Sequence, residues 1–166
     1  MPDHQFTIRP EATSDLADIE RLCANTFGPG RFARSAYRLR EGARAVEALC
    51  FTAWLGPRLV GSIRFTSVRI GDADGALLLG PLAVDPEFAG QGCGRALIAR
   101  GLETARDLSY RMVLLVGDLP YYEKFGFKIA PRGKIVLPGP ADPSRILVAE
   151  LAEGATENVA GRVTLT

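Results

Sequence analysis

The amino-acid sequence predicts a mixed α/β fold for this 166-residue chain, and three observations support that prediction. An apolar strand over Leu77–Val84 leads through a glycine-spaced turn into an amphipathic helix over Arg95–Leu108. Two earlier extended runs joined by a tight turn are typical of an antiparallel hairpin. A further apolar strand, Met112–Val116, follows the helix, and a strand reached through a crossover helix lies parallel to the strand before it.

The strand Leu77–Val84 is the centre of this prediction. Its side chains are apolar without alternation, which indicates burial on both faces. Pro81 lies inside it, and a proline in a central strand indicates a bulge or a local loss of pairing because it has no N–H to donate.

The segments before this strand alternate between extended and helical patterns. Apolar residues spaced by three and four positions predict a first helix, and a Gly-Pro-Gly run ends it. The expected elements are a strand at Phe6–Arg9, this first helix at about Asp15–Thr26, a second, basic helix at Arg31–Glu41, strands at Cys50–Leu55 and Leu59–Ile70, and a turn at Gly71–Gly75.

A short helix is predicted at Tyr121–Phe125, because Pro120 suits a first helical turn and Gly126 is placed to end it. For Arg162–Leu165 an edge strand and a frayed tail both stay open. The other expected elements are an extended run at Phe127–Ile129, an ordered loop at Pro131–Pro143 with room for a short strand at Ile135–Leu137, and a strand at Ile146–Leu151.

The composition is that of a globular protein in solution. The chain is 47% apolar and 23% charged, with a formal net charge of +1, so charge gives no argument for binding nucleic acid or an anionic membrane. No apolar run reaches the roughly 18–20 residues that a membrane span needs, and the N-terminus lacks the pattern of a secretory signal. We expect one cytoplasmic domain over residues 1–166, with its core at about 6–151, that binds neither nucleic acid nor membrane; homodimer formation stays open.

Three cysteines, Cys23, Cys50 and Cys93, cannot all pair with one another, and none of them has C-x-x-C spacing. Reduced thiols are therefore expected, without a disulfide framework or a metal site. Cys93 lies inside the glycine turn, where two interpretations are open. A helix N-terminus lowers the pKa of a thiol, but a buried free cysteine usually fills space as a small hydrophobe, and this second interpretation is favoured.

Gly90, Gly92 and Gly94 alternate between the strand and the helix. A strand, a glycine turn and a helix present unpaired backbone N–H groups to an anion, and glycine has no side chain to keep a phosphate away. The spacing does not fit a dinucleotide fingerprint, because Arg95 stands where its last glycine is required. A nucleoside-triphosphate loop is excluded too, since no Gly-Lys-Ser/Thr occurs here.

Three features then follow in chain order. The buried strand ends in Leu-Ala-Val-Asp-Pro, the turn Gly-Gln-Gly-Cys-Gly-Arg opens the helix, and Tyr122–Phe127 reads Tyr-Glu-Lys-Phe-Gly-Phe. This combination resembles the GNAT acetyltransferase superfamily, whose members transfer acetyl from acetyl-CoA to an amine. The resemblance covers roughly Phe6–Leu151, and its specific part is Leu79–Phe127.

The resemblance implies a GNAT fold of the α/β (α+β) class. Its mixed central sheet would have about six to seven strands, splayed between the fourth and fifth and flanked by about four helices. Acetyl-CoA would lie in that gap as co-substrate, with its pantetheine arm bonded to the backbone of Leu82, Ala83 and Val84. A bulge at Pro81 would free backbone groups for it. The turn residues would hold its pyrophosphate: Ala89, Gly90, Gln91, Gly92, Cys93, Gly94 and Arg95.

One position departs from the family pattern. The family has Gln or Arg three residues before its paired glycines, and alignment on Gly92 and Gly94 puts Ala89 there. A side-chain contact to the phosphates is therefore missing, while the backbone amides remain. Arg95 in the first helical turn either compensates or is a solvated arginine.

Tyr122 matches the family tyrosine that protonates the departing CoA thiolate, and a phenol with an ordinary pKa near 10 suits that role. For Tyr121 a packing role on the sheet is expected. Asp118 stands where many family members have asparagine, which leaves its role open. Asp85 and Glu87 are candidates for the general base only by proximity, and turn-capping is the alternative for both.

We expect an acetyl-CoA-dependent N-acetyltransferase that moves acetyl to a primary amine by direct transfer through a tetrahedral intermediate. The acceptor, a small-molecule or peptide amine, would lie against the first two helices and the Pro131–Pro143 loop. Because His4 is the single histidine, a histidine-based triad is not available. The alternative is a domain that binds acyl-CoA as a sensor without catalysis.

Overall fold

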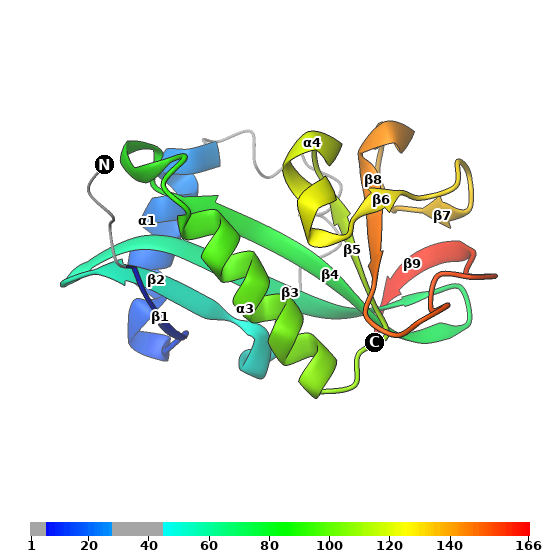
Figure 1. The fold of residues 1–166 in the computed structure, drawn as a ribbon, viewed down its shortest axis with the longest axis horizontal. Coiled ribbons are helices and arrows are strands. Elements are labelled where there is room, and N and C mark those ends of the chain that lie inside the picture. Colours follow the sequence, from blue (N-terminus) through cyan, green and yellow to red (C-terminus); the bar gives the residue numbers. More distant parts are fainter. Residues whose placement is uncertain (1–5, 28–44) are drawn as a thin grey trace.

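The computed structural model describes residues 6–27 and 45–166, and in these ranges it contains a mixed sheet of nine strands with three α-helices (Figure 1). The predicted helix at Arg31–Glu41 lies outside the described residues. The helices are α1 (Leu16–Phe27), α3 (Cys93–Asp107) and α4 (Leu119–Tyr122). The strands are β1 (Thr7–Pro10), β2 (Phe51–Leu55), β3 (Arg58–Ile70), β4 (Ala73–Val84), β5 (Met112–Val116), β6 (Lys128–Ile129), β7 (Ile135–Val136), β8 (Ile146–Glu150) and β9 (Gly161–Leu165).

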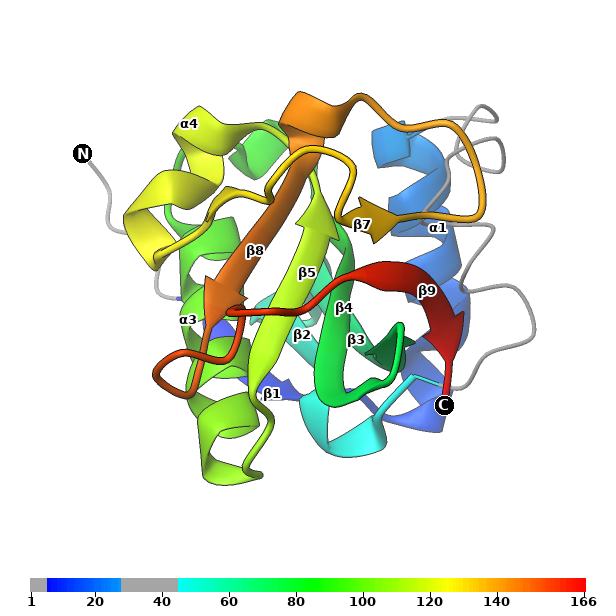
Figure 2. The same cartoon turned by 90° about the vertical axis from the view of Figure 1, so that its right-hand side faces the viewer.

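The strand order is β1-β2-β3-β4-β5-β8-β6, with β9 paired to β3 and β7 paired to β9. β1 to β4 are antiparallel neighbours, whereas β4 and β5 are parallel, as the sequence predicts. Nine strands replace the expected six to seven because the two-residue β6 and β7 and the C-terminal β9 also pair. Arg162–Leu165 is thus an edge strand and not a frayed tail, since β9 pairs with the C-terminal end of β3 (Figure 2).

β4 and β5 pair over a short ladder only. It joins Ala76–Leu78 on β4 to Met112–Leu114 on β5. Beyond this ladder β4 continues beside β3, and β5 continues beside β8 as far as Val116. The two central strands therefore separate toward their C-terminal ends, which confirms the predicted splay.

A β-bulge lies just beyond the last β4 residue that pairs with β5. In the ladder between β3 and β4, the single residue Arg64 opposes both Gly80 and Pro81. A bulge bends and twists its strand, so the separation of β4 from β5 begins where the backbone of β4 changes direction. The bulge that Pro81 predicts is confirmed.

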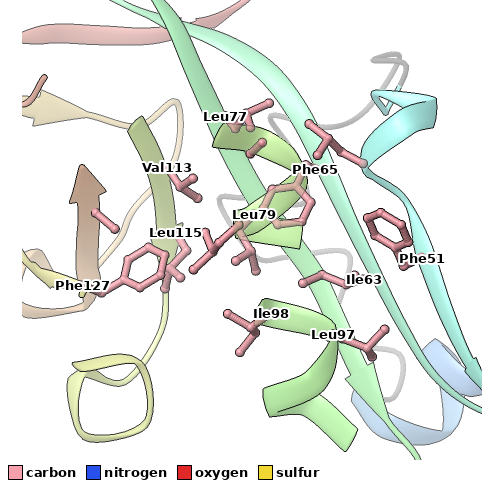
Figure 3. Packing of buried hydrophobic residues seen from close by; sticks show 14 of the residues in the cluster. Phe51, Ile63, Phe65, Leu77, Leu79, Leu97, Ile98, Val113, Leu115 and Phe127 are labelled. Atoms are coloured by element: carbon pink, nitrogen blue, oxygen red, sulfur yellow. The ribbon is translucent and has the colours of Figure 1, made fainter. Parts of the chain in front are cut away.

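Helix α3 packs on one face of the sheet, in front of β2, β3 and β4 in Figure 1. Leu97 and Ile98 of α3 join buried side chains of these strands and of β5, among them Phe65 and Leu79 (Figure 3). Gly101 allows this close approach, because a Cβ there would lie well inside 3.0 Å of the Phe65 ring. This cluster holds α3, and with it the glycine turn, against the end of β4.

Different parts of the chain cover the opposite face. Helix α1 places Ile19, Leu22 and Cys23 against Ala83 of β4. The chain from β6 to β7, together with β9, covers β5 and β8 through a second cluster that includes Met112, Leu114, Ala130, Ile135, Leu137, Val148 and Val163. Within residues 6–27 and 45–166, no helix is long and apolar enough to cross a membrane.

Candidate functional site

The diverging ends of β4 and β5 leave one edge of β4 without a neighbouring strand. Leu82, Ala83 and Val84 pair with β3 on one side. On their other side no described strand pairs with them, since the ladder to β5 ends at Leu78. An extended ligand can add to such an edge through main-chain hydrogen bonds. These are the three residues whose backbone would bind a pantetheine arm if the resemblance noted in the sequence holds.

Gly90 and Gly92 shape the surface in front of α3. Their φ angles of +76° and +91° lie in the left-handed region that favours glycine, and a Cβ built on either would have no heavy atom within 4 Å beyond its chain neighbours. The first bond inside the helix runs from the Ala96 N–H to the Gly92 carbonyl at 3.0 Å. The amides of 93–95 therefore have no partner within the helix, and its first turn has no acidic residue. This surface fits a phosphate.

The side chains around the turn provide one cation. Ala89 is exposed, and its methyl group can donate no hydrogen bond. The Gln91 side chain is engaged within the preceding turn, where its Nε2 donates to the Glu87 carbonyl at 3.5 Å. Arg95 is exposed in the first turn of α3, and its guanidinium has no ion-pair partner in the described part of the chain. Arg95 is therefore free to meet an anion on this surface.

Cys93 faces inward from the same turn. The side chain is buried, and its Sγ lies 2.7 Å from where a Cβ of Gly61 would be. Burial raises the pKa of this thiol to about 11, so it stays protonated near neutrality. The interpretation of Cys93 as a small buried side chain is confirmed, and that of a thiol with a lowered pKa is wrong. Only its backbone amide is available to an anion.

Tyr122 lies at the end of α4, on the β5 side of the opening. Its ring packs edge-on against Tyr121 at 4.9 Å between centroids and against Phe127 at 5.7 Å. Gly117 makes room for the ring, because a Cβ there would lie 2.6 Å from Tyr122 Cε2. The half-buried phenol is therefore held by packing on three sides.

Burial raises the pKa of Tyr122 to about 12, and the charges of Tyr121 and Asp118 act in the same direction, while Arg145 acts against them. The sequence predicted an ordinary pKa near 10. The difference arises because the low-polarity surroundings disfavour the phenolate. Tyr122 is thus a hydrogen-bond donor at any physiological pH, but it is less acidic than a free phenol.

Asp118 precedes α4 and is exposed. Its carboxylate accepts from Arg145 Nε at 3.2 Å, and its carbonyl accepts from the N–H groups of Tyr121 and Tyr122 at 3.1 and 3.3 Å. The ion pair links the start of α4 to the 3₁₀ turn Pro143–Arg145 that precedes β8, and the carbonyl accepts the first bonds of the helix that holds both tyrosines. The structure thus gives Asp118 contacts that position α4.

The carboxylates of Asp85 and Glu87, which follow β4, both have hydrogen-bond and ion-pair partners. Asp85 accepts from the Glu87 N–H at 3.0 Å and from Arg58 at 2.9 Å, and Glu87 accepts from the same guanidinium at 2.8 Å. Asp85 thereby caps the short 3₁₀ turn at Pro86–Phe88. These contacts favour the turn-capping interpretation of Asp85 over a role as general base, whereas the carboxylate of Glu87 is an exposed ion-pair partner of Arg58 and caps no turn.

Tyr121 differs from the expectation of a residue packed on the sheet, since its side chain is 41% exposed. Its hydroxyl instead reaches α3 across the opening: a Cβ on Gly94 would lie well inside 3.0 Å of that oxygen. Sequence analysis missed this placement. A signal for it was the adjacent Tyr-Tyr pair on one short helix, because neighbouring helical residues cannot point the same way.

An open groove of about 650 Å³ lies beside α1, the β2–β3 turn and the residue that follows β4. Its lining includes Arg21 and Arg58, and each of these is paired with an acid of the same lining, Asp18 and Asp85 respectively. The groove therefore has no excess of either charge among these four residues. The basic helix predicted at Arg31–Glu41, whose arginines fit either an acidic acceptor or a solvated helix face, lies outside the described residues.

Comparison with known proteins agrees with this architecture. Residues 14–127 match the model of the acetyltransferase (GNAT) family. The chain is 31% identical over 157 residues to YhbS, an uncharacterized N-acetyltransferase of Escherichia coli K12, covering 94% of this chain and 93% of YhbS. It is 35% identical over 131 residues to YjhQ, another uncharacterized N-acetyltransferase of that strain, covering 77% and 72%. The chain belongs to the GNAT acetyltransferase family.

Two solved structures share the fold. The complex of Escherichia coli YhbS with CoA has a TM-score of 0.84 at 28% identity, covering 100% of this chain and 92% of that one. A GNAT acetyltransferase of Brucella melitensis, in complex with acetyl-CoA, has a TM-score of 0.65 at 32% identity, covering 87% and 95%. The predicted GNAT fold is confirmed.

Proposed function

We propose that this chain transfers an acetyl group from acetyl-CoA to a primary amine of a small molecule or a peptide. The observation that carries the proposal is the opening between β4 and β5, which has a free strand edge, an anion surface and a tyrosine around it. Its GNAT relatives have been solved with CoA and with acetyl-CoA. Acetyl-CoA supplies the activated acetyl group as co-substrate.

The free edge of β4 would bind the pantetheine arm through the backbone of Leu82, Ala83 and Val84, as an added strand. The turn would bind the pyrophosphate through its amides, with Arg95 as the one flexible cation there. The open surface over Gly90 and Gly92 supports this assignment, because nothing in the described chain fills it. Ala89 adds no side-chain contact.

Direct transfer requires that the amine attack the thioester carbonyl, that the tetrahedral intermediate be stabilised, and that the thiolate leave. A backbone N–H of β4 would polarise the carbonyl. Tyr122 would donate its proton toward the departing sulfur. The pKa of its phenol, about 12, is roughly three units above that of a thiol. Tyr122 would therefore first stabilise the negative charge that develops on the sulfur by a hydrogen bond, and transfer of the proton would follow.

Two measurements on the wild type and Tyr122→Phe test the proposal. Calorimetry measures the Kd for CoA, and thiol release measures acetylation of a broad panel of amines. The wild type should bind CoA and acetylate at least one amine, and Tyr122→Phe should lose about 10²-fold in kcat with little change in Kd. Unchanged kcat in the variant would refute the role of Tyr122.

The same experiment separates the two classes of function. If the wild type binds CoA tightly but acetylates no amine in the panel, the chain is an acyl-CoA sensor and the enzyme proposal is wrong. The observation that favours testing this second function is that both candidates for the general base, Asp85 and Glu87, are ion-paired with Arg58.

A further inference from the structure

We propose that Tyr121 is a cofactor-binding residue whose hydroxyl donates a hydrogen bond to the diphosphate of CoA. The inference rests on the proposed function, because it concerns the same opening. The sequence predicts only a packing role for this side chain. It comes from α4 and not from β4 or the glycine turn, which supply the other groups proposed to bind CoA.

The first argument is position. Tyr121 is attached to α4, beyond β5, yet its hydroxyl lies against Gly94 in the first turn of α3, beyond β4. Val84 Cγ2 lies 3.5 Å from the same Cβ position on Gly94. The phenol therefore spans the mouth of the opening from one strand end to the other. A ligand that runs along β4 to the turn has to pass beside this hydroxyl.

The second argument is charge. Burial raises the pKa of Tyr121, so the hydroxyl keeps its proton and can donate. Arg95 lies close enough to act on that pKa in the opposite direction, and Lys124 Nζ lies 5.1 Å from the centre of the tyrosine ring. The Arg95 guanidinium, the Tyr121 hydroxyl and the unpaired amides of α3 thus lie around the same end of the opening, and Lys124 lies over the face of the tyrosine ring. This combination of donors suits a doubly charged diphosphate better than a neutral amide of pantetheine.

The third argument is restraint of the ring. Tyr121 is held edge-on by Tyr122 at 4.9 Å and tilted against Phe125 at 6.4 Å. A tyrosine loses only two side-chain torsions on ordering, and here its neighbours already restrict it. The hydroxyl is therefore placed before the ligand arrives, which lowers the entropy cost of using it.

Tyr121→Phe tests the hydrogen bond, with Tyr110→Phe as the matched control. Tyr110 follows the C-terminal end of α3, about 20 Å along the helix from Gly94. Calorimetry with CoA should show about a 10-fold higher Kd for Tyr121→Phe and no change for Tyr110→Phe. With acetyl-pantetheine as acyl donor, which has no diphosphate, kcat/KM should be equal in Tyr121→Phe and wild type.

A second variant, Gly94→Ala, tests the geometry. Its new methyl group would collide with the Tyr121 hydroxyl, but in Tyr121→Phe the next atoms would be 3.5 Å and 3.7 Å away, which is ordinary contact. Gly94→Ala should therefore raise the Kd for CoA about 10-fold in the wild type and leave it nearly unchanged in Tyr121→Phe. Such non-additivity is expected only if the two residues act on the ligand together.

The outcomes are distinct. If the wild type binds CoA and Tyr121→Phe binds it equally well, this inference is wrong and the proposed function stands. An equal loss with acetyl-pantetheine also overturns it, because the hydroxyl then acts on the pantetheine arm or on the chemistry. Additive losses in the double variant would also overturn it, because Gly94 and Tyr121 would then act on the ligand separately. If the wild type binds no CoA, the proposed function itself has failed.

Discussion

The ring of Tyr122 lies directly over Gly117, where a Cβ would come within 2.6 Å of its Cε2 atom. Gly117 is buried, and its φ is not in the left-handed region. The position therefore requires the absence of a side chain and not an unusual backbone conformation. It follows that Gly117 sets where the phenol of Tyr122 stands in the opening.

Gly117→Ala should displace this phenol and lower kcat by about 10- to 100-fold, because small errors of placement at the reacting group are costly. Overpacking should also cost about 1–3 kcal/mol of stability. Gly101→Ala is the control: it forces a methyl group against Phe65 in the core, so it should cost similar stability and, by displacing α3 and its turn, raise the Kd for CoA, but leave kcat at saturating acetyl-CoA intact. Denaturant unfolding and acetylation kinetics on both variants measure the two effects. Equal losses of kcat would contradict the positioning role.

Ala89→Gln should tighten CoA binding by about three- to tenfold. The exposed methyl group of Ala89 beside the glycine turn has no donor, whereas a glutamine amide there could reach a phosphate, and a hydrogen bond to a charged group is worth about 1.5–3 kcal/mol before exposure reduces it. Calorimetry with CoA is the measurement. Ala89→Met, which adds similar length without a donor, should leave the Kd unchanged. A Kd for Ala89→Gln that is unchanged or higher would place position 89 away from the phosphates.

Alkaline pH should destabilise the fold through its buried thiols. Burial raises the pKa of Cys93 and of Cys50 from 9.0 to about 11. The folded state holds these protons more tightly than the unfolded state. The contribution of these protonated thiols to the free energy of unfolding is therefore fully present below pH 9 and is lost as the pH rises from about 9 through 11.

Between pH 8 and pH 10 each of these thiols should cost roughly 1 kcal/mol of unfolding free energy. Urea unfolding of the wild type at both pH values measures these contributions together with that of Tyr122, whose pKa burial also raises. In Cys93→Ala the stability at pH 8 will also change because a buried atom is lost, so the informative quantity is the pH dependence, which should fall by roughly 1 kcal/mol. A pH dependence equal to that of the wild type would mean that Cys93 does not contribute it.

Most of the local structure could be predicted. The periodicity of Leu97, Ile98, Gly101 and Leu102 places α3 correctly, because a helix repeats within one turn of sequence. The beginning of β4 was missed, since the strand starts at Ala73 and not at Leu77. The turn predicted at Gly71–Gly75 is shorter than expected, because β4 already pairs with β3 from Ala73 onward.

The candidate site was predictable where a motif is local. The glycine turn and the tyrosine of the Tyr-x-x-x-Gly-Phe pattern are visible in the chain, and both now lie around the opening. The engagement of Asp85 by Arg58 could not be foreseen, because 27 positions separate them and only the approach of the β2–β3 turn to the end of β4 brings them together. The inward direction of Cys93 likewise depends on Gly61 from another strand.

By itself the sequence determined that a buried strand, a glycine turn, a helix and a parallel strand follow one another, and that Pro81 interrupts the first strand, because these follow from local apolar spacing and from backbone chemistry. The tertiary structure decided how far β4 and β5 pair and which tyrosine faces which edge of the opening. It also decided that β9 closes onto β3. These depend on contacts between residues far apart in the chain, whose pairing free energy is not contained in any local pattern.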